Sequence, residues 1–228
     1  MNHEGEIDLA ALAAISPERL AAMLAEAATM LPCMQRRLYF ELYVQQGGNV
    51  VTATREWIDE FSRQTSFLDA EQIREAAWEL DAIRAVIVTH VVLAAPDHAP
   101  DMMWRFFKLA ETVFERTAEE GWDVRCVFDE ACADLIKVSA HAGTEPTIFA
   151  ERVLAAVVSN EYGQYNALVR ATAETEPWAA AYLSQLKVLL QQSLDKQPRA
   201  KDGTSGSRNL KLQQLQDTLQ ELSIRRGT

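Results

Sequence analysis

The chain has 228 residues, of which 48% are hydrophobic and 24% charged, and its 22 Lys and Arg against 33 Asp and Glu give a formal charge of −11. This composition is typical of a folded globular protein and excludes wholesale disorder. The acidic balance also argues against a body that binds nucleic acid through charge alone, because the phosphate backbone requires a cationic surface.

The cysteines and the first residues favour a reducing compartment. Cys33, Cys126 and Cys132 are odd in number and form no C-x-x-C pair, so they predict no disulfide framework. Residues 1–7 lack the basic start and apolar run of a signal peptide. The longest apolar stretch, residues 85–95, is shorter than the roughly 20 residues of a transmembrane helix. We therefore expect a cytoplasmic protein without membrane contact.

Apolar residues recur at helical spacing from the N-terminal region onward. Ser16 followed by Pro17-Glu18 is a typical helix start, with a capping hydroxyl, a proline at the first position and an early acid. Pro32 closes this helix and opens the next, which Gly47-Gly48 is expected to end because glycine adopts the left-handed C-cap geometry. A third helix is predicted over residues 50–62.

The clearest helix signal begins at Asp69, which forms a capping-box pattern with Gln72. An apolar stripe then runs from Ile73 as far as Pro96. Its second half, Val86–Val92, is almost wholly apolar, and we predict that it is the most buried helix of the molecule.

A further helix is predicted from Met102 and ends before Gly121. Another is predicted over residues 123–140, and the residues expected to face inward are Val124, Val127, Phe128, Ala131, Leu135 and Val138. Thr144 and Thr175 each begin a Thr-Glu-Pro sequence, which predicts two more helix starts with threonine caps. Residues 160–165 form a glycine-centred turn between them. No convincing strand appears, so we expect an all-α fold, either α-solenoid-like or an irregular array of helical hairpins.

The C-terminal part differs from the rest, and the expected organisation is a helical-repeat domain over residues 1–195, a flexible linker over 196–209 and an amphipathic helix over 210–226. Residues 196–228 carry seven Lys and Arg against three Asp and Glu. Four leucines follow at coiled-coil spacing, too briefly to establish a coiled coil: Leu212, Leu215, Leu219 and Leu222. This helix is expected to dock on the body, in the same chain or across a homodimer, or else to bind a partner.

No motif for metal, cofactor or catalytic chemistry is present. The four histidines form no H-E-x-x-H or E-x-x-H pattern, and no glycine-rich phosphate loop or G-x-S-x-G sequence occurs. Cys132 and His141 could form a nucleophile and base if they met in space, but a small buried thiol and an unrelated loop histidine explain them better. We expect neither a metal nor a cofactor.

The candidate binding residues are Trp104, Arg105, Tyr162 and Tyr165. Trp, Tyr and Arg are the residue types enriched at protein-binding hot spots. The alternative is structural, with Trp104 facing the core and the two tyrosines holding a turn between helices.

Several segments in order resemble a known family: Met103–Phe106, Val113–Arg116, Val127–Ala131, Ala150–Leu154 and Tyr162–Tyr165. They are similar to an uncharacterised bacterial family of helical-repeat domains, some of whose members occur near SWIM-type zinc-finger proteins. The resemblance covers about residues 16–195 and implies an α-solenoid-like fold with no established activity. The chain lacks the Cys and His spacing of a SWIM finger, so no zinc or DNA-binding role follows.

The expected function is that of a protein- or peptide-binding module without catalytic activity. Two alternatives stay open: an enzyme whose site is assembled between helices, and a nucleic-acid-associated accessory protein that acts through its basic tail. Nucleic acid is the less favoured partner because the body is acidic.

Overall fold

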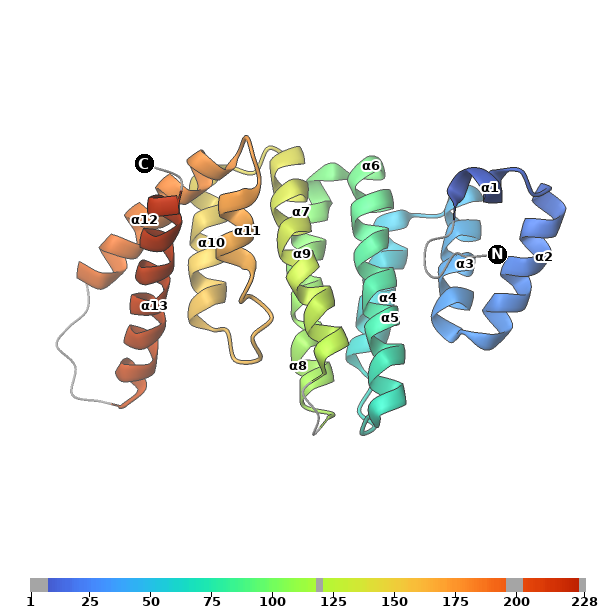
Figure 1. Ribbon diagram of the computed structural model, residues 1–228, viewed down its shortest axis with the longest axis horizontal. Helices are drawn as coiled ribbons and strands as arrows, with labels where there is room; N and C mark the ends of the chain where they lie inside the picture. The colour runs from blue at the N-terminus through green and yellow to red at the C-terminus, as the bar shows by residue number, and fades with distance from the viewer. Residues whose placement is uncertain (1–7, 118–120, 196–202, 226–228) are drawn as a thin grey trace. The chain divides into compact units, whose positions relative to one another are not determined.

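The computed structural model describes residues 8–117, 121–195 and 203–225, and these residues form helices without any strand (Figure 1). The prediction of an all-α fold is therefore confirmed. The chain divides into two compact units, Met1–Asn49 and Val50–Thr228. The expected boundary at residue 195 does not separate compact units, because the helices on its two sides pack together. None of the described helices combines the length and the apolar character needed to cross a bilayer.

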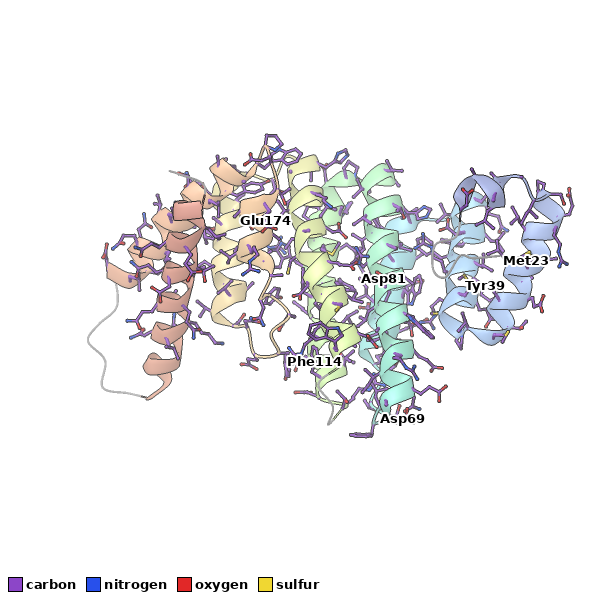
Figure 2. All side chains as sticks on the ribbon, viewed as in Figure 1. Met23, Tyr39, Asp69, Asp81, Phe114 and Glu174 are labelled. Carbon is purple, nitrogen blue, oxygen red and sulfur yellow. The ribbon has the colours of Figure 1, made fainter. Side chains whose placement is uncertain are left out.

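The first unit contains α1 (Leu9–Ala13), α2 (Pro17–Met30) and α3 (Pro32–Gln45). The predicted start of α2 is present, since Ser16 Oγ accepts a hydrogen bond from the Arg19 N–H at 3.3 Å. Gly47, with a φ of 84°, closes α3 as the glycine pair predicted. In α2 and α3, whose side chains are all described, Phe40 alone is buried. Met23 and Tyr39, labelled in Figure 2, are among the exposed apolar side chains of this thinly packed hairpin.

The second unit contains α4 (Val50–Ser62), α5 (Ala70–Val86), a π-helical turn η1 (Ile87–Val91), α6 (Val92–Ala94), a 3-10 turn η2 (Pro96–His98), α7 (Ala99–Phe107), α8 (Leu109–Phe114), α9 (Trp122–His141), α10 (Pro146–Val158), α11 (Leu168–Glu174), α12 (Ala179–Asp195) and α13 (Gly203–Arg225). The predicted capping box starts α5. Asp69 Oδ1 accepts from the Gln72 N–H at 3.0 Å, and Gln72 Oε1 accepts from the Asp69 N–H at the same distance.

The prediction that Val86–Val92 is the most buried helix was wrong. The backbone widens there into the π-helical turn, in which the Val92 N–H donates to the Ile87 carbonyl. Ile87 and Val91 are fully buried, but Thr89 is exposed and Val88 and Val92 are only half-buried. Leu93, just beyond the segment, is 80% exposed. The segment packs against α4 and α7, and the side chains that these two helices leave uncovered face solvent.

The core of this unit is an aromatic cluster centred on α7. All of α7 is buried except Asp101 and Arg105. The ring centroid of Phe107 lies 6.0 Å from that of Phe128 on α9 and 4.9 Å from that of Tyr165. The predicted inward side of α9 is confirmed by the burial of Val124, Val127, Phe128, Ala131, Leu135 and Val138.

A charged network fastens α5 to α9. The Arg84 guanidinium pairs with Asp81 at 2.6 Å, with Glu130 at 2.7 Å and with the buried Asp134 (Asp81 is labelled in Figure 2). Burial alone lowers the pKa of Arg84, but its hydrogen bonds and charge interactions with Asp81 and Asp134 raise that pKa on balance. A half-buried guanidinium paired in this way fixes the two helices in one register.

The two threonine caps predicted later in the chain are absent. Glu145 is the residue before α10, and the Thr144 N–H instead donates to the Ser139 carbonyl at 2.9 Å, which closes α9 after Gly143. Thr175 ends α11, where its Oγ1 donates to the Ala171 carbonyl at 2.8 Å. Both threonines belong to the helix that ends before them, because a helix C-terminus leaves carbonyls that need donors.

The last helix, α13, begins at Gly203 rather than at residue 210, so the part of the expected flexible linker from residue 203 to 209 is helical. Residues 196–202 and 226–228 of the expected linker and tail lie outside the described residues. α13 packs against α10, α11 and α12 (dark red in Figure 1). Packing holds the middle of α13, and extending an existing helix by one residue costs much less free energy than starting a new one. This explains why the glycine- and serine-containing residues 203–209 are helical.

Candidate functional site

Four cations contributed by three parts of the second unit surround a cleft of about 270 Å³. Arg55 comes from α4, Arg105 from α7, Lys108 from the residue after α7 and Arg152 from α10. We call this feature, together with Trp104 and Asp101 in its wall, the basic cleft. Such a concentration of positive charge stands out in a chain whose formal charge is −11.

Trp104 forms part of the wall of the basic cleft. Its ring centroid lies 6.0 Å from that of Tyr165, and the guanidinium carbon of Arg152 lies 4.9 Å above its ring. Arg152 Nη1 also donates to Asp101 Oδ1 at 2.5 Å. Stacking and ion pairing together hold Arg152 in one orientation. Trp104 itself is buried, as its structural alternative anticipated.

Arg105 is held from the opposite helix. Its Nη2 and Nε donate to Asp59 Oδ1 on α4 at 2.7 and 3.2 Å. Arg55 and Lys108 are exposed, and neither makes an ion pair with a described residue. The cleft therefore combines two positioned guanidiniums with two uncompensated cations.

Tyr162 lies at a different place. Its hydroxyl donates to Glu115 Oε1 at 2.8 Å, and its ring stacks on that of Phe114 at 6.2 Å (Phe114 is labelled in Figure 2). Arg125 Nη1 donates to the Tyr162 carbonyl at 3.1 Å. The hydrogen bond to Glu115 raises the pKa of Tyr162 to about 12. These contacts fasten the 160–166 turn to α8 and α9, which is a structural role.

Tyr165 connects two surfaces of the second unit. It is buried, its ring touches Trp104 and Phe107, and burial raises its pKa to about 12. It also lines a hollow of about 240 Å³ between the 160–166 turn and α13. Of the four candidate binding residues, the structure thus places Trp104 and Arg105 at the cleft, with Tyr165 behind Trp104 and Tyr162 elsewhere.

The leucines of the tail face the body of the same chain. Leu212, Leu215 and Leu219 are buried, and Leu222 is half-buried. We call the surface of α10, α11 and α12 that they contact the tail groove. Its apolar lining comes mainly from Val157, Val169, Leu190 and Leu194.

A polar contact fixes the register of α13 in the tail groove. Lys211 Nζ donates to the Val158 and Asn160 carbonyls, each at 3.0 Å. These carbonyls lie at the C-terminal end of α10, where the helix dipole and unpaired carbonyls favour a cation. Lys211 therefore determines which end of α13 meets α10.

The residues considered for nucleophilic chemistry do not come together. Cys132 and His141 are nine residues apart on α9, which puts them about half a turn apart, on opposite sides of the helix. Cys132 is buried, its Sγ donates to the Gln164 carbonyl at 3.7 Å, and burial raises the pKa of its thiol. A thiol with a raised pKa is a poor nucleophile. Within the described residues, no group of three or more His, Cys, Asp or Glu side chains is arranged to hold a metal ion.

Sequence reasoning missed Arg55, Lys108, Arg152 and Lys211. Arg55 and Arg152 are almost a hundred residues apart in the chain, and each looks like an ordinary exposed position on an amphipathic helix. Arg105 pairs with Asp59 and Arg152 pairs with Asp101, and in each pair the two residues lie on different helices, so no helical spacing in the sequence connects them. No local signal could have identified the three residues of the basic cleft, because only the packing of α4, α7 and α10 brings them together. Lys211 reaches its carbonyl partners only because α13 docks beside α10.

Comparison with known proteins gives one match. No curated protein and no solved structure is significantly similar to the chain. A family model described as "Family of unknown function (DUF6880)" matches residues 4–226. Since this match covers nearly the whole sequence, the chain belongs to the DUF6880 family of unknown function.

Proposed function

We propose that the protein is a non-catalytic interaction module that binds an amphipathic helix of a partner protein in the tail groove. The observation that supports this proposal is the way α13 sits there, with three leucines buried and Lys211 on the end of α10. In this proposal α13 is a ligand supplied by the chain itself, and a partner helix with the same pattern replaces it. The odd number of cysteines and their lack of C-x-x-C spacing support a reducing, cytoplasmic setting.

The recognised pattern follows from α13. It is a lysine followed by leucines at positions one, four and eight after it, as in Lys211, Leu212, Leu215 and Leu219. The leucines provide affinity through burial, and the lysine provides direction through its two carbonyl contacts. A helix that enters in the reverse direction loses the lysine contact.

Release of α13 should make the groove available to a helix added from outside. Leu215 is 3% exposed and Leu210, on the same helix, is 56% exposed. The full chain with Leu215→Glu should lose most of the docking of α13, because a buried leucine contributes about 1.5–3 kcal/mol and a charge cannot replace it. The full chain with Leu210→Glu is the matched control, because it makes the same chemical change at an exposed site.

The measurement is the fluorescence anisotropy of a labelled synthetic peptide of residues 203–225. We expect at least about tenfold tighter binding to Leu215→Glu than to the wild type, and equal binding to Leu210→Glu and the wild type. Peptides selected from a random library on Leu215→Glu should then contain the lysine and leucine pattern and be displaced by the labelled peptide.

Two results would contradict the proposal. Equal binding of the tail peptide to the wild type and to Leu215→Glu would show that α13 does not occupy a binding surface. If the library yields no binding peptide although the tail peptide still binds, the groove accepts only α13, either of the same chain or of a second copy. Sedimentation of the wild type over a range of concentrations distinguishes these two, because only exchange between copies produces a dimer.

A further inference from the structure

We propose that the basic cleft is a binding site for a phosphomonoester dianion, a role independent of the tail groove. The cleft is formed by side chains of α4, α7 and α10, whereas the tail groove is formed by α10, α11 and α12. Three observations carry the proposal: the local charge, the fixed orientation of two guanidiniums, and the size of the cleft.

The local charge matches a dianion. Arg55, Arg105, Lys108 and Arg152 are cationic, and among the described residues only Asp59 and Asp101 pair with them, which leaves two of these positive charges uncompensated there. A phosphomonoester carries about −1.5 to −2 charges at pH 7. A carboxylate or sulfate ester with a single charge leaves one of these cations unmatched.

The two paired arginines are positioned before any ligand arrives. Arg152 is held by Trp104 and Asp101, and Arg105 is held by Asp59. Each guanidinium has five N–H donors, and its hydrogen bonds to Asp59 or Asp101 use only part of them. Both side chains line the cleft, and the fork of a guanidinium suits phosphate oxygens.

The two uncompensated cations complete the site. Arg55 and Lys108 lie on exposed positions at its rim, on α4 and at the end of α7. Both can approach a bound anion without giving up an ion pair with a described residue. The positioned arginines therefore provide geometry, and Arg55 and Lys108 provide net charge.

The size of the cleft limits the part of the ligand that it holds. Its volume of about 270 Å³ lies just below the range of about 300–1,000 Å³ that is usual for small-molecule sites. We infer that it encloses the phosphate and the adjoining atoms, while the carrier extends outward. The carrier is either a phosphorylated protein side chain or a free phosphorylated metabolite, which share the same phosphate chemistry.

The test compares two probes of nearly equal shape by calorimetric titration of the full chain at low ionic strength. Phenyl phosphate is a dianion near pH 8, and phenyl sulfate is a monoanion. We expect saturable 1:1 binding of phenyl phosphate, at least about tenfold tighter than binding of phenyl sulfate, and weaker binding as salt is added.

Variants show whether the binding belongs to this cleft. Arg55→Gln combined with Lys108→Gln should weaken binding of phenyl phosphate at least about tenfold, because both uncompensated charges are lost. Arg170→Gln, the same change at an exposed position of α11 outside the cleft, should leave the affinity unchanged. Circular dichroism of all variants verifies that they are folded.

Equal affinity for phenyl phosphate and phenyl sulfate, the absence of saturable binding, or wild-type affinity in the double variant would each overturn the proposal. Two further probes identify the carrier once binding is established. Tighter binding of a phosphoserine peptide than of phenyl phosphate supports a phosphorylated protein. Equal binding of phenyl phosphate and phosphoserine peptide supports recognition of the phosphate end of a free metabolite.

Discussion

Replacing Ile87 by alanine tests how the π-helical turn is packed. Ile87 is 0% exposed, and the turn that contains it lies against α4 and α7. Side chains held on these two helices cannot easily collapse into the space that a shortened side chain leaves. Buried isoleucine-to-alanine changes cost about 2–5 kcal/mol, and the cost grows with the residual cavity. We therefore expect Ile87→Ala to lower the free energy of unfolding by about 3–5 kcal/mol.

Leu93→Ala is the matched control in the same apolar stretch. Leu93 is 80% exposed, so removal of its side chain should change the free energy of unfolding by less than about 0.5 kcal/mol. If the whole apolar stretch of residues 85–95 were buried, both variants would lower the free energy of unfolding by comparable amounts. The structure predicts a large difference between them.

Urea unfolding followed by tryptophan fluorescence measures both variants. All five tryptophans lie after residue 49, so this signal reports the second unit alone. The Tm of Ile87→Ala should fall by about 6–20 °C, at about 2–4 °C for each kcal/mol. A loss below about 1 kcal/mol for Ile87→Ala, or an equal loss for Leu93→Ala, would refute the packing argument.

Three further predictions concern hydrogen bonds. The pKa of Tyr162 is raised to about 12, so the stability that this tyrosine contributes is complete below pH 10 and is lost as the pH rises toward 12. Tyr162→Phe should remove this loss of stability at high pH. A pH titration followed by absorbance at 295 nm should show one tyrosine fewer among those that ionise at high pH. Arg116 is buried and donates from Nε to the Ser66 carbonyl at 2.7 Å, so Arg116→Met should destabilise the second unit by about 1–3 kcal/mol in urea, whereas no change would show that water replaces the guanidinium. Asp69→Ala should cost about 1 kcal/mol and increase hydrogen exchange in the first turn of α5, and unchanged exchange there would contradict the capping role.

The tail groove and the basic cleft were accessible to sequence reasoning to different degrees. The spacing of Leu212, Leu215 and Leu219 predicts an apolar side that needs a partner surface, and all three are buried. The sequence did not indicate which helices provide that surface. Trp104 and Arg105 were selected by residue type, and the structure places both at the cleft. Their partners there come from two other helices.

Local interactions explain what the sequence determined by itself. Helical period, the capping box at Asp69, the glycine stop after α3 and the inward side of α9 depend on residues a few positions apart, so their signals can be read along the chain. Tertiary structure decided the rest. Whether Leu93 is covered, whether Thr144 begins one helix or ends another, and whether Arg55 meets Arg152 depend on which helices pack together. That packing is set by the summed burial of many apolar side chains that are distant in sequence. Because this burial is non-directional, no spacing along the sequence shows which two charged residues it brings together.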